Sequence, residues 1–367
     1  MVKHNFADAT TFGNNSIQSK TNMEYLANNQ RVDDDPTAAE RKKDHIELAF
    51  KSQVTKREID DRFYYEPLLA AHPKGNEWGD FEFLGKTMRV PLWVSSMTGG
   101  TALAKTINHN LARACKDFGM GMGLGSCRSL LFDDATLSDF NVRPLMGDDL
   151  PLYANLGIAQ LEQLIDKKEL WRVDALVDKL QADGLIIHVN PMQEWLQPEG
   201  DRFEKSPLET IETFLNQSTI PIIVKEVGQG MGKKSLDALL RMPIQAVDFA
   251  ANGGTNFARL ELARSSEMHR EIFGRLAQVG HSAEDMVNIT NALIEEHSPR
   301  CPQVIISGGI QHFLDGYYLI NKLKMPAIYG QASAFLKHAR GGYDELFAYV
   351  NAQVEGLSLA KAFLKVR

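Results

Sequence analysis

Cysteine is scarce in the sequence: the 367 residues include only Cys115, Cys127 and Cys301, which lie far apart. An odd number of widely spaced cysteines implies no disulfide framework, so we expect three reduced thiols in or near the core. No apolar run approaches the roughly 20 residues that a membrane-spanning helix needs, and residues 1–6 lack the apolar core of a signal peptide. We therefore expect a cytoplasmic protein with no membrane span.

The sequence also lacks a block of basic residues, and its net charge is −7. These two features argue against nucleic acid as a partner. Apolar residues make up 44% of the chain and charged residues 24%, which is typical of a globular protein. The length fits an α/β barrel of about 250 residues with additions.

Residues 1–38 are rich in Asn, Asp, Thr and Ser and show little apolar periodicity. We interpret them as a flexible N-terminal extension, and residues 39–367 as one catalytic domain. A helical pattern over 39–51 opens this domain and carries three basic side chains that can converge on one helix face, Arg41, Lys42 and His45. Taken alone, a short basic helix end is more typical of a solvated surface.

Eight short apolar segments alternate with helical patterns from residue 91 onward. The predicted strands are 91–95, 120–124, 152–154, 184–187, 222–224, 246–248, 304–306 and 327–329. The helical patterns include 101–118, 171–180, 208–215, 283–296, 313–323 and 343–364. Such alternation implies parallel strands with crossover helices, and eight strands favour closure. The predicted fold class is therefore α/β, a TIM (β/α)8 barrel with an N-terminal extension.

An open, doubly wound sheet is the alternative fold. A dinucleotide-binding sheet of that type carries Gly-x-Gly-x-x-Gly directly after its first strand. No such pattern follows residues 91–95 at the required spacing, so the glycines disfavour the open sheet.

The ends of the predicted strands are rich in glycine and in hydrogen-bonding side chains. In a barrel these positions line one mouth, where sites are built. They carry Thr98, Gly99, Gly100, Ser126, Arg128, Asn155, His188, Asn190, Gln193, Glu194, Lys225, Thr255, Gly308, Gly309 and Gly330. The polar residues are densest after the strand 184–187. Because buried polar groups cost free energy unless they are satisfied, we interpret this mouth as a ligand site.

Glycines follow the last two predicted strands, at Gly308-Gly309 and at Gly330. Barrels commonly bind a phosphate at these two places, because glycine lets backbone N–H groups approach an anion closely. Either group alone could be an ordinary turn. Both together favour a phosphate group, and Gly253-Gly254-Thr255 can add N–H donors and a hydroxyl.

Two charged residues at the mouth allow more than one role. Lys225 can be a Schiff-base nucleophile, a cation beside the reduced form of a flavin, or an ordinary surface lysine. Glu194 can bind Mg²⁺, which takes one or two carboxylates plus substrate phosphates. It can also be a general base, or neither.

The chain resembles the type 2 isopentenyl-diphosphate delta-isomerases, which depend on FMN and Mg²⁺. The resemblance covers about residues 41–336. It rests on motifs that recur in order: Arg41-Lys42-x-x-His45, Met97-Thr98-Gly99-Gly100, His188-x-Asn190-x-x-Gln193-Glu194, Lys225-Glu226-Val227-Gly228-x-Gly230, Gly253-Gly254-Thr255 and Ser307-Gly308-Gly309-Ile310.

The resemblance implies that FMN lies across the barrel mouth. The cofactor-binding residues that it implies are Met97, Thr98, Gly99, Ser126, Asn155, Lys225, Thr255, Gly308, Gly309, Gln331 and Ala332. The substrate-binding residues that it implies are Arg41, Lys42, His45, Arg128, His188, Asn190 and Gln193. Glu194 is the implied metal ligand, and Gln193 and Lys225 are the implied catalytic residues.

The implied reaction interconverts isopentenyl diphosphate and dimethylallyl diphosphate without net redox change. Moving an alkene proton requires an acid and a base, yet no strong acid–base pair is evident beside Gln193. The N5 of a reduced flavin, which can give and take a proton, fills that gap. By the same resemblance NADPH serves only to reduce the flavin, and the subunits form a homotetramer or homo-octamer.

The sequence departs from the family pattern in three places. Gln311 stands where an arginine commonly follows the Gly-Gly-Ile motif, Asn256-Phe257 replaces a Ser-Trp type pair, and Cys127 lies in the Gly-Ser-x-Arg run. The missing arginine removes one cation near the expected FMN phosphate.

The main rival function is an FMN-dependent barrel oxidoreductase. A 2-hydroxy-acid oxidase needs a histidine base and an arginine late in the barrel, and 255–261 holds no such pair. An inosine-monophosphate dehydrogenase needs a nucleophilic cysteine in a mobile loop, for which Cys127 is a poor candidate. A further rival is an inactive flavin-binding sensor. The joint presence of His188, Gln193, Glu194 and Lys225 argues against that sensor.

Overall fold

The computed structural model describes residues 37–75, 78–96, 98–99 and 102–367. The chain separates into two compact units, 1–60 and 61–367. The described part of the first unit contains helix α2 (Ala38–Leu48), which buries none of its side chains. Most of the predicted extension, residues 1–36, lies outside the described residues.

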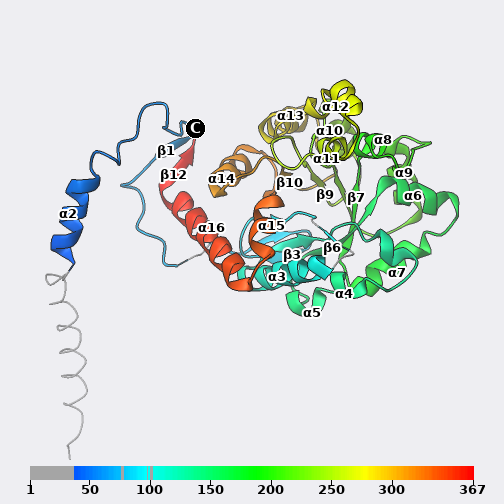
Figure 1. Cartoon of the computed structure of the whole chain (residues 1–367), viewed down its shortest axis with the longest axis horizontal. Coiled ribbons are helices and arrows are strands. Elements are labelled where there is room, and N and C mark those ends of the chain that lie inside the picture. The colour runs from blue at the N-terminus through cyan, green and yellow to red at the C-terminus, as the bar shows by residue number, and fades with distance from the viewer. Residues whose placement is uncertain (1–36, 76–77, 97, 100–101) are drawn as a thin grey trace, which may run out of the picture. The chain divides into compact units, whose positions relative to one another are not determined.

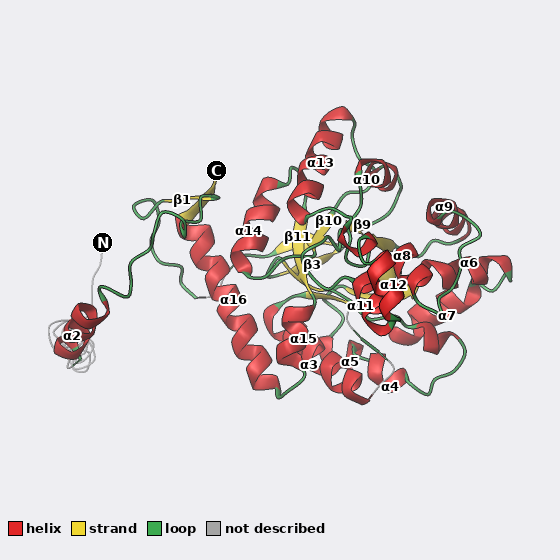
Figure 2. Cartoon of the chain, turned by 45° about the horizontal axis from the view of Figure 1, so that its top comes forward, coloured by secondary structure: helices red, strands yellow, loops and turns green. Residues whose placement is uncertain are grey.

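A closed barrel of eight parallel strands forms the centre of the second unit (Figure 2). Its strands are β4 (Leu92–Val94), β5 (Gly121–Gly123), β6 (Leu152–Gly157), β7 (Gly184–His188), β8 (Ile222–Lys225), β9 (Ala246–Asp248), β10 (Val304–Ser307) and β11 (Ala327–Gln331). Neighbours in sequence pair with one another, and β11 closes the ring on β4. The predicted TIM barrel is confirmed, and the open sheet is excluded.

Helices surround the barrel (Figures 1 and 2). The longer ones are α3 (Ala102–Phe118), α6 (Ile158–Asp166), α7 (Trp171–Leu180), α9 (Pro207–Gln217), α10 (Lys233–Leu240), α13 (Ala283–Glu296), α14 (Phe313–Lys322), α15 (Ser333–Ala339) and α16 (Tyr343–Phe363). Figure 1 shows α16 on the outside, where it packs against α3, α14 and α15. A serine capping box fixes the first turn of α9, Ser206 with Glu209, and that of α13, Ser282 with Asp285.

Successive side chains of a strand point to opposite faces. In β7, Leu185 and Ile187 pack outward among the helices, whereas Ile186 points into the barrel. The inward side chains form one cluster with those of the hairpin β2 (Phe81–Phe83) and β3 (Lys86–Met88). We call this cluster the apolar plug: Phe83, Leu84, Met88, Trp93, Tyr153, Ile186, Ile223, Ala246, Ile305 and Ile328.

The next inward-facing position of each strand, towards its carboxyl end, carries a polar residue or glycine. We call these positions the polar layer: Ser95, Gly123, Asn155, His188, Lys225, Asp248, Ser307 and Gly330. Most of them are buried, because the plug lies on one side and the loops of the mouth lie on the other. Strand alternation therefore places the polar groups together at one end of the barrel.

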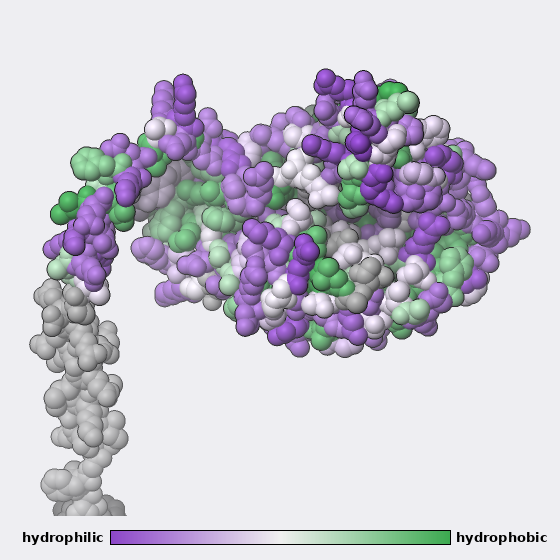
Figure 3. Space-filling model, viewed as in Figure 1, coloured by the Kyte–Doolittle hydropathy of each residue, from purple (hydrophilic) through white to green (hydrophobic). Residues whose placement is uncertain are grey.

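The second unit also contains a short strand pair and three buried cysteines, and its visible surface is largely hydrophilic (Figure 3). Strands β1 (Phe63–Tyr65) and β12 (Leu364–Val366) pair antiparallel and join its beginning to its end. Cys115, Cys127 and Cys301 are buried and free, as predicted. Within the described residues no helix is long and apolar enough to cross a membrane. Hydrophilic residues cover much of the helical shell that is visible in Figure 3.

Close packing between α14 and β11 provides a test of this fold. A methyl group at Gly316 would overlap the ring of Tyr329, which is fully buried. Overpacking of this kind costs about 1–3 kcal/mol, more than the roughly 1 kcal/mol that alanine gains over glycine in a helix. We expect Gly316→Ala to lower the midpoint of urea unfolding. At Gly341 a methyl group meets only the flexible Glu345 carboxylate, at 3.3 Å, so Gly341→Ala should leave the midpoint unchanged. Equal midpoints for the two variants would contradict this packing.

Candidate active site

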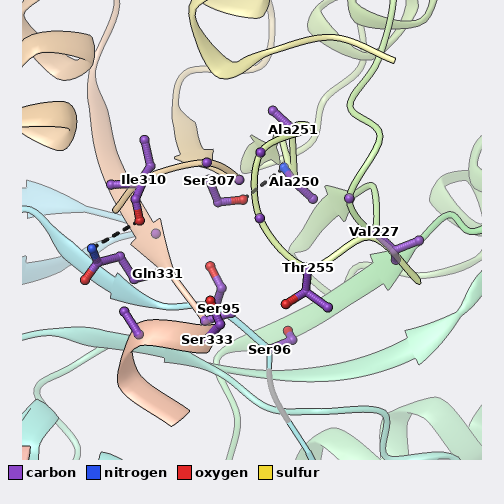
Figure 4. Close-up of a pocket in the computed structure, with 18 of the residues that line it drawn as sticks. Ser95, Ser96, Val227, Ala250, Ala251, Thr255, Ser307, Ile310, Gln331 and Ser333 are labelled. Carbon is purple, nitrogen blue, oxygen red and sulfur yellow. Dashed lines mark hydrogen bonds between the residues drawn. The ribbon is translucent and has the colours of Figure 1, made fainter. Parts of the chain in front are cut away.

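A cavity of about 360 Å³ opens above the polar layer, at the ends of β4, β8, β9, β10 and β11. Six residues predicted to bind a cofactor line it: Lys225, Thr255, Gly308, Gly309, Gln331 and Ala332. Other lining residues are Ser95, Ser96, Gly253, Gly254, Gly330, Ser333 and Lys337. Figure 4 shows the side chains of Ser95, Ser96 and Thr255 around this cavity. We call it the glycine-lined cavity.

The glycines of this cavity allow two loops to approach each other. Gly308 and Gly309 have φ values of +89° and +75°, which other residues rarely adopt. A side chain at Gly308 would overlap the backbone of Ala251, and one at Gly253 would lie 2.9 Å from the Cα of Gly309. Backbone N–H groups can therefore line the cavity without side chains in front of them. Such backbone concavities bind anions.

Two serines point to a polar occupant of the same cavity. The hydroxyl oxygens of Ser95 and Ser96 are buried and have no hydrogen-bond partner among the described residues. Buried polar groups without a partner are costly and rare, so a polar ligand here would satisfy them. Neither serine was predicted as a site residue. The available signal was spacing, since Ser95 follows the inward-facing Trp93 by two residues.

The side chain of Gln331 has structural partners. Its amide group donates to the carbonyl of Ile310 at 3.3 Å and accepts from Gln353 of α16 at 3.0 Å; the first of these bonds is drawn in Figure 4. The side-chain amide of Gln331 is therefore held within the fold, and its backbone carbonyl accepts the N–H of Ser95 at 3.0 Å.

Lys225 is 9% exposed and donates to the carbonyl of Glu226 at 2.7 Å. The Glu226 carboxylate accepts the N–H groups of Gly228, Gln229 and Gly230 at 2.6, 2.6 and 2.9 Å. Burial raises the pKa of Glu226, and these hydrogen bonds oppose that rise. The carboxylate thus holds the loop after β8 in place beside Lys225.

His188 is paired with Asn155 in the polar layer. The Nδ2 of Asn155 donates to the carbonyl of Leu124 at 3.0 Å, so its Oδ1 accepts from Nδ1 of His188 at 2.7 Å. Burial, followed by the charge of Lys225, lowers the pKa of His188 to about 4. The imidazole is therefore neutral near pH 7, and its Nε2 carries a lone pair. His188 can donate from Nε2 only after it takes up a proton.

The polar residues after β7 bond to one another at the start of α8 (Pro191–Leu196). The Nδ2 of Asn190 donates to Oε1 of Gln193 at 3.1 Å and to Oε1 of Glu194 at 2.9 Å. The Oδ1 of Asn190 is buried without a partner among the described residues. These bonds hold the predicted site residues Asn190, Gln193 and Glu194 together. The Oδ1 of Asn190 is available to accept a hydrogen bond from a ligand.

Asp201, which was not predicted, connects this unit to Arg128. Its N–H donates to Oε2 of Glu194 at 2.8 Å. Its carboxylate accepts from Arg128 at 3.2 Å and from Gln160 at 2.9 Å. Arg128 is exposed, so this ion pair contributes little stability. Its effect is to bring Arg128 to the residue whose backbone N–H also binds Glu194.

Several predicted residues lie away from the glycine-lined cavity. Among the described residues its lining does not include Thr98, Gly99, Ser126 or Asn155. Met97 and Gly100 lie outside the described residues. Arg41, Lys42 and His45 are exposed on α2, in the first unit. No cluster of three or more His, Cys, Asp or Glu side chains suited to a metal occurs in the described part of the chain.

Fold and site together define a TIM-barrel enzyme, because the polar groups gather where such barrels carry out their chemistry. An isopentenyl-diphosphate delta-isomerase of Rickettsia felis is 34% identical over 343 residues, which cover 92% of this chain and 94% of that protein. The Rickettsia typhi protein of the same name is 35% identical over 305 residues, covering 82% and 86%. The chain belongs to the isopentenyl-diphosphate delta-isomerase family, and the predicted resemblance is confirmed.

No protein-family model matches the chain. Among solved structures, a mandelate oxidase mutant with a monooxide FMN adduct has a TM-score of 0.53 at 13% identity, covering 84% of this chain and 89% of that one. A mutant flavocytochrome b2 with bound pyruvate has a TM-score of 0.56 at 13% identity, covering 82% and 72%. At such low identity the likeness concerns the fold alone.

The pairing of His188 with Asn155 predicts a measurable titration. In the ligand-free protein we expect one imidazole to carry its proton on Nδ1 and to gain a second only near pH 4. Long-range ¹⁵N–¹H NMR correlations would report both properties, with His188→Gln identifying the signal. The unfolded chain, with an ordinary pKa of 6.5, binds this proton first, so the group lowers stability as the pH falls from 6.5 towards 4. A ring protonated on Nε2, or titrating above pH 6, would refute this arrangement.

Proposed function

We propose that this chain interconverts isopentenyl diphosphate and dimethylallyl diphosphate, with bound reduced FMN and with Mg²⁺. The observation that carries the proposal is the 34% identity to the Rickettsia felis isomerase, which runs over 92% of the chain. The matched part of the chain includes the motif residues that gather at the barrel mouth.

The glycine-lined cavity is the proposed site for the FMN phosphate. Its backbone concavity at Gly308 and Gly309 suits an anion, and the unpartnered hydroxyls of Ser95 and Ser96 suit a polar group. Thr255 and Ala332 lie on the same walls. Lys225 also lines the cavity, which supports its role beside the isoalloxazine ring. The solved structures of the same fold include one with an FMN adduct.

The cluster after β7 is the proposed site for the substrate diphosphate and Mg²⁺. Glu194 would bind the metal, because Mg²⁺ accepts a single carboxylate when substrate phosphates supply further oxygens. Arg128 and protonated His188 would bind the diphosphate, together with Asn190. We further propose that Arg41, Lys42 and His45 of α2 add cations to this site.

The alkene would lie beside Gln193. The hydrogen bond from Asn190 to its Oε1 fixes the carboxamide, so Gln193 can orient the carbon that gains or loses a proton. When bound, reduced FMN supplies a nitrogen that can give and take a proton. Lys225 would stabilise the negative charge of the reduced form. In this proposal NADPH is the reductant, and the enzyme is a cytoplasmic homotetramer or homo-octamer.

The direct test is turnover. Enzyme loaded with FMN, reduced by NADPH and supplied with Mg²⁺ should convert isopentenyl diphosphate to dimethylallyl diphosphate, which NMR of the product resolves. Gln193→Ala should lower kcat by about 10²-fold or more, the scale of a positioned proton-transfer step, with the flavin absorbance unchanged. Absence of product would overturn the proposal, and oxidation of a 2-hydroxy acid instead would favour the oxidoreductase.

Lys337 of α15 offers a substitute for the arginine that the family pattern places at position 311. Gln311 and Lys337 both line the glycine-lined cavity. The cation that the phosphate requires can therefore come from α15, although the loop after β10 lacks it.

We expect Lys337→Gln to weaken FMN binding about tenfold, equal to about 1.4 kcal/mol. Gln311→Arg in that background should restore the affinity. Riboflavin, which has no phosphate, is the control: its affinity should be the same for all three proteins in fluorescence titrations. An equal loss for riboflavin and FMN would show that Lys337 acts on the fold instead of on the phosphate.

A further inference from the structure

Asp248 is a fully buried carboxylic acid for which the proposed reaction has no use. It ends β9 in the polar layer, directly across from Lys225 of β8. Its Oδ1 accepts from the hydroxyl of Ser307, whereas its Oδ2 has no partner among the described residues. Asp248 is absent from the described lining of the glycine-lined cavity, whereas Lys225 lines it.

Lys225 and Asp248 are register partners on β8 and β9, and the charge of Lys225 acts on the Asp248 carboxyl group, although no direct ion pair joins them in the described part of the chain. His188 lies on the other side of Lys225 and is neutral near pH 7. The Glu226 carboxylate is taken up by the N–H groups of its own loop. Burial raises the pKa of Asp248, and the charge of Lys225 together with the Ser307 hydroxyl opposes that rise. Lys225 is thus the cation whose charge favours the ionised form of Asp248 against the effect of burial.

We propose that Asp248 is a positioning residue that holds a negative charge against Lys225 and so limits the positive charge that the polar layer presents to bound FMN. The proposal rests on the proposed function for the identity of the ligand. A buried ion without its partner is strongly unfavourable, so each member of the pair makes the other tolerable inside the barrel. Removal of Asp248 would leave Lys225 uncompensated, which favours the anionic, reduced cofactor over the neutral, oxidised one.

A double-mutant cycle on the cofactor-free protein tests the charge pair without reference to any reaction. Lys225→Met should destabilise the protein because it leaves the Asp248 carboxylate alone in the barrel. Lys225→Met with Asp248→Asn should then have a folding equilibrium constant at least tenfold larger than Lys225→Met alone, measured by urea unfolding. Ser307→Ala is the control, because it removes the hydroxyl that donates to Asp248 and keeps the carboxylate. Rescue by Ser307→Ala, or none by Asp248→Asn, would overturn the charge pair.

A second measurement applies if Lys225→Met does not fold. In Asp248→Asn loaded with FMN, the preference for reduced over oxidised cofactor should rise about tenfold, equal to about +30 mV for a two-electron couple. Equilibration with a redox dye measures this potential, and Ser307→Ala should not reproduce the shift. An unchanged potential would overturn the inference. If the parent protein binds no FMN, the proposed function fails, while the unfolding cycle still decides whether the pair exists.

Discussion

The alternation of side chains along strands that close into a barrel is the constraint on which this structure depends. Every barrel strand except the glycine-rich β5 sends one residue into the apolar plug, and every strand sends its next inward residue into the polar layer. The apolar plug excludes water from one side of the polar layer. Lys225, Asp248 and His188 therefore lie in an environment of low dielectric constant, where charges interact strongly. Lys225 can lie there because Asp248 is its neighbour, and its charge in turn helps to keep His188 neutral.

The hydrogen bonds of the mouth separate structural groups from groups that await a ligand. Asn155 is bonded to His188, and Oδ1 of Asp248 is bonded to Ser307, whereas Oδ2 of Asp248 has no partner among the described residues. Glu226 satisfies the loop after β8. The buried hydroxyls of Ser95 and Ser96 and the Oδ1 of Asn190 have no such partner in the described part of the chain. Because unpaired buried groups are costly, these three atoms point to ligand binding at two places: the glycine-lined cavity and the cluster after β7.

Sequence patterns were sufficient for the barrel because its strands are short apolar runs bounded by glycine, proline and polar residues. They also placed Lys225 directly after such a run and Gly308 two residues after another, and both residues line the glycine-lined cavity. They could not identify Asp201 or Lys337, whose importance arises from contacts between loops and helices distant in the sequence. The sequence indicated that Asp248 ends a strand. The role proposed for it depends on the strand register, which places it opposite Lys225 and which the sequence does not show. The roles given to Thr98, Ser126 and the basic residues of α2 stay predictions.

The fold alone does not distinguish an isomerase from an oxidase, since mandelate oxidase and flavocytochrome b2 have the same barrel at 13% identity. The distinction has to come from the side chains around the cofactor cavity. A 2-hydroxy-acid oxidase needs a base that removes a proton from its substrate. Here the mouth offers a carboxamide at Gln193, a neutral imidazole tied to Asn155, and a carboxylate at Glu194 already linked to Arg128 through Asp201. Under the proposed function this set would bind the diphosphate and its metal, with His188 protonated, and the proton transfer would fall to the cofactor.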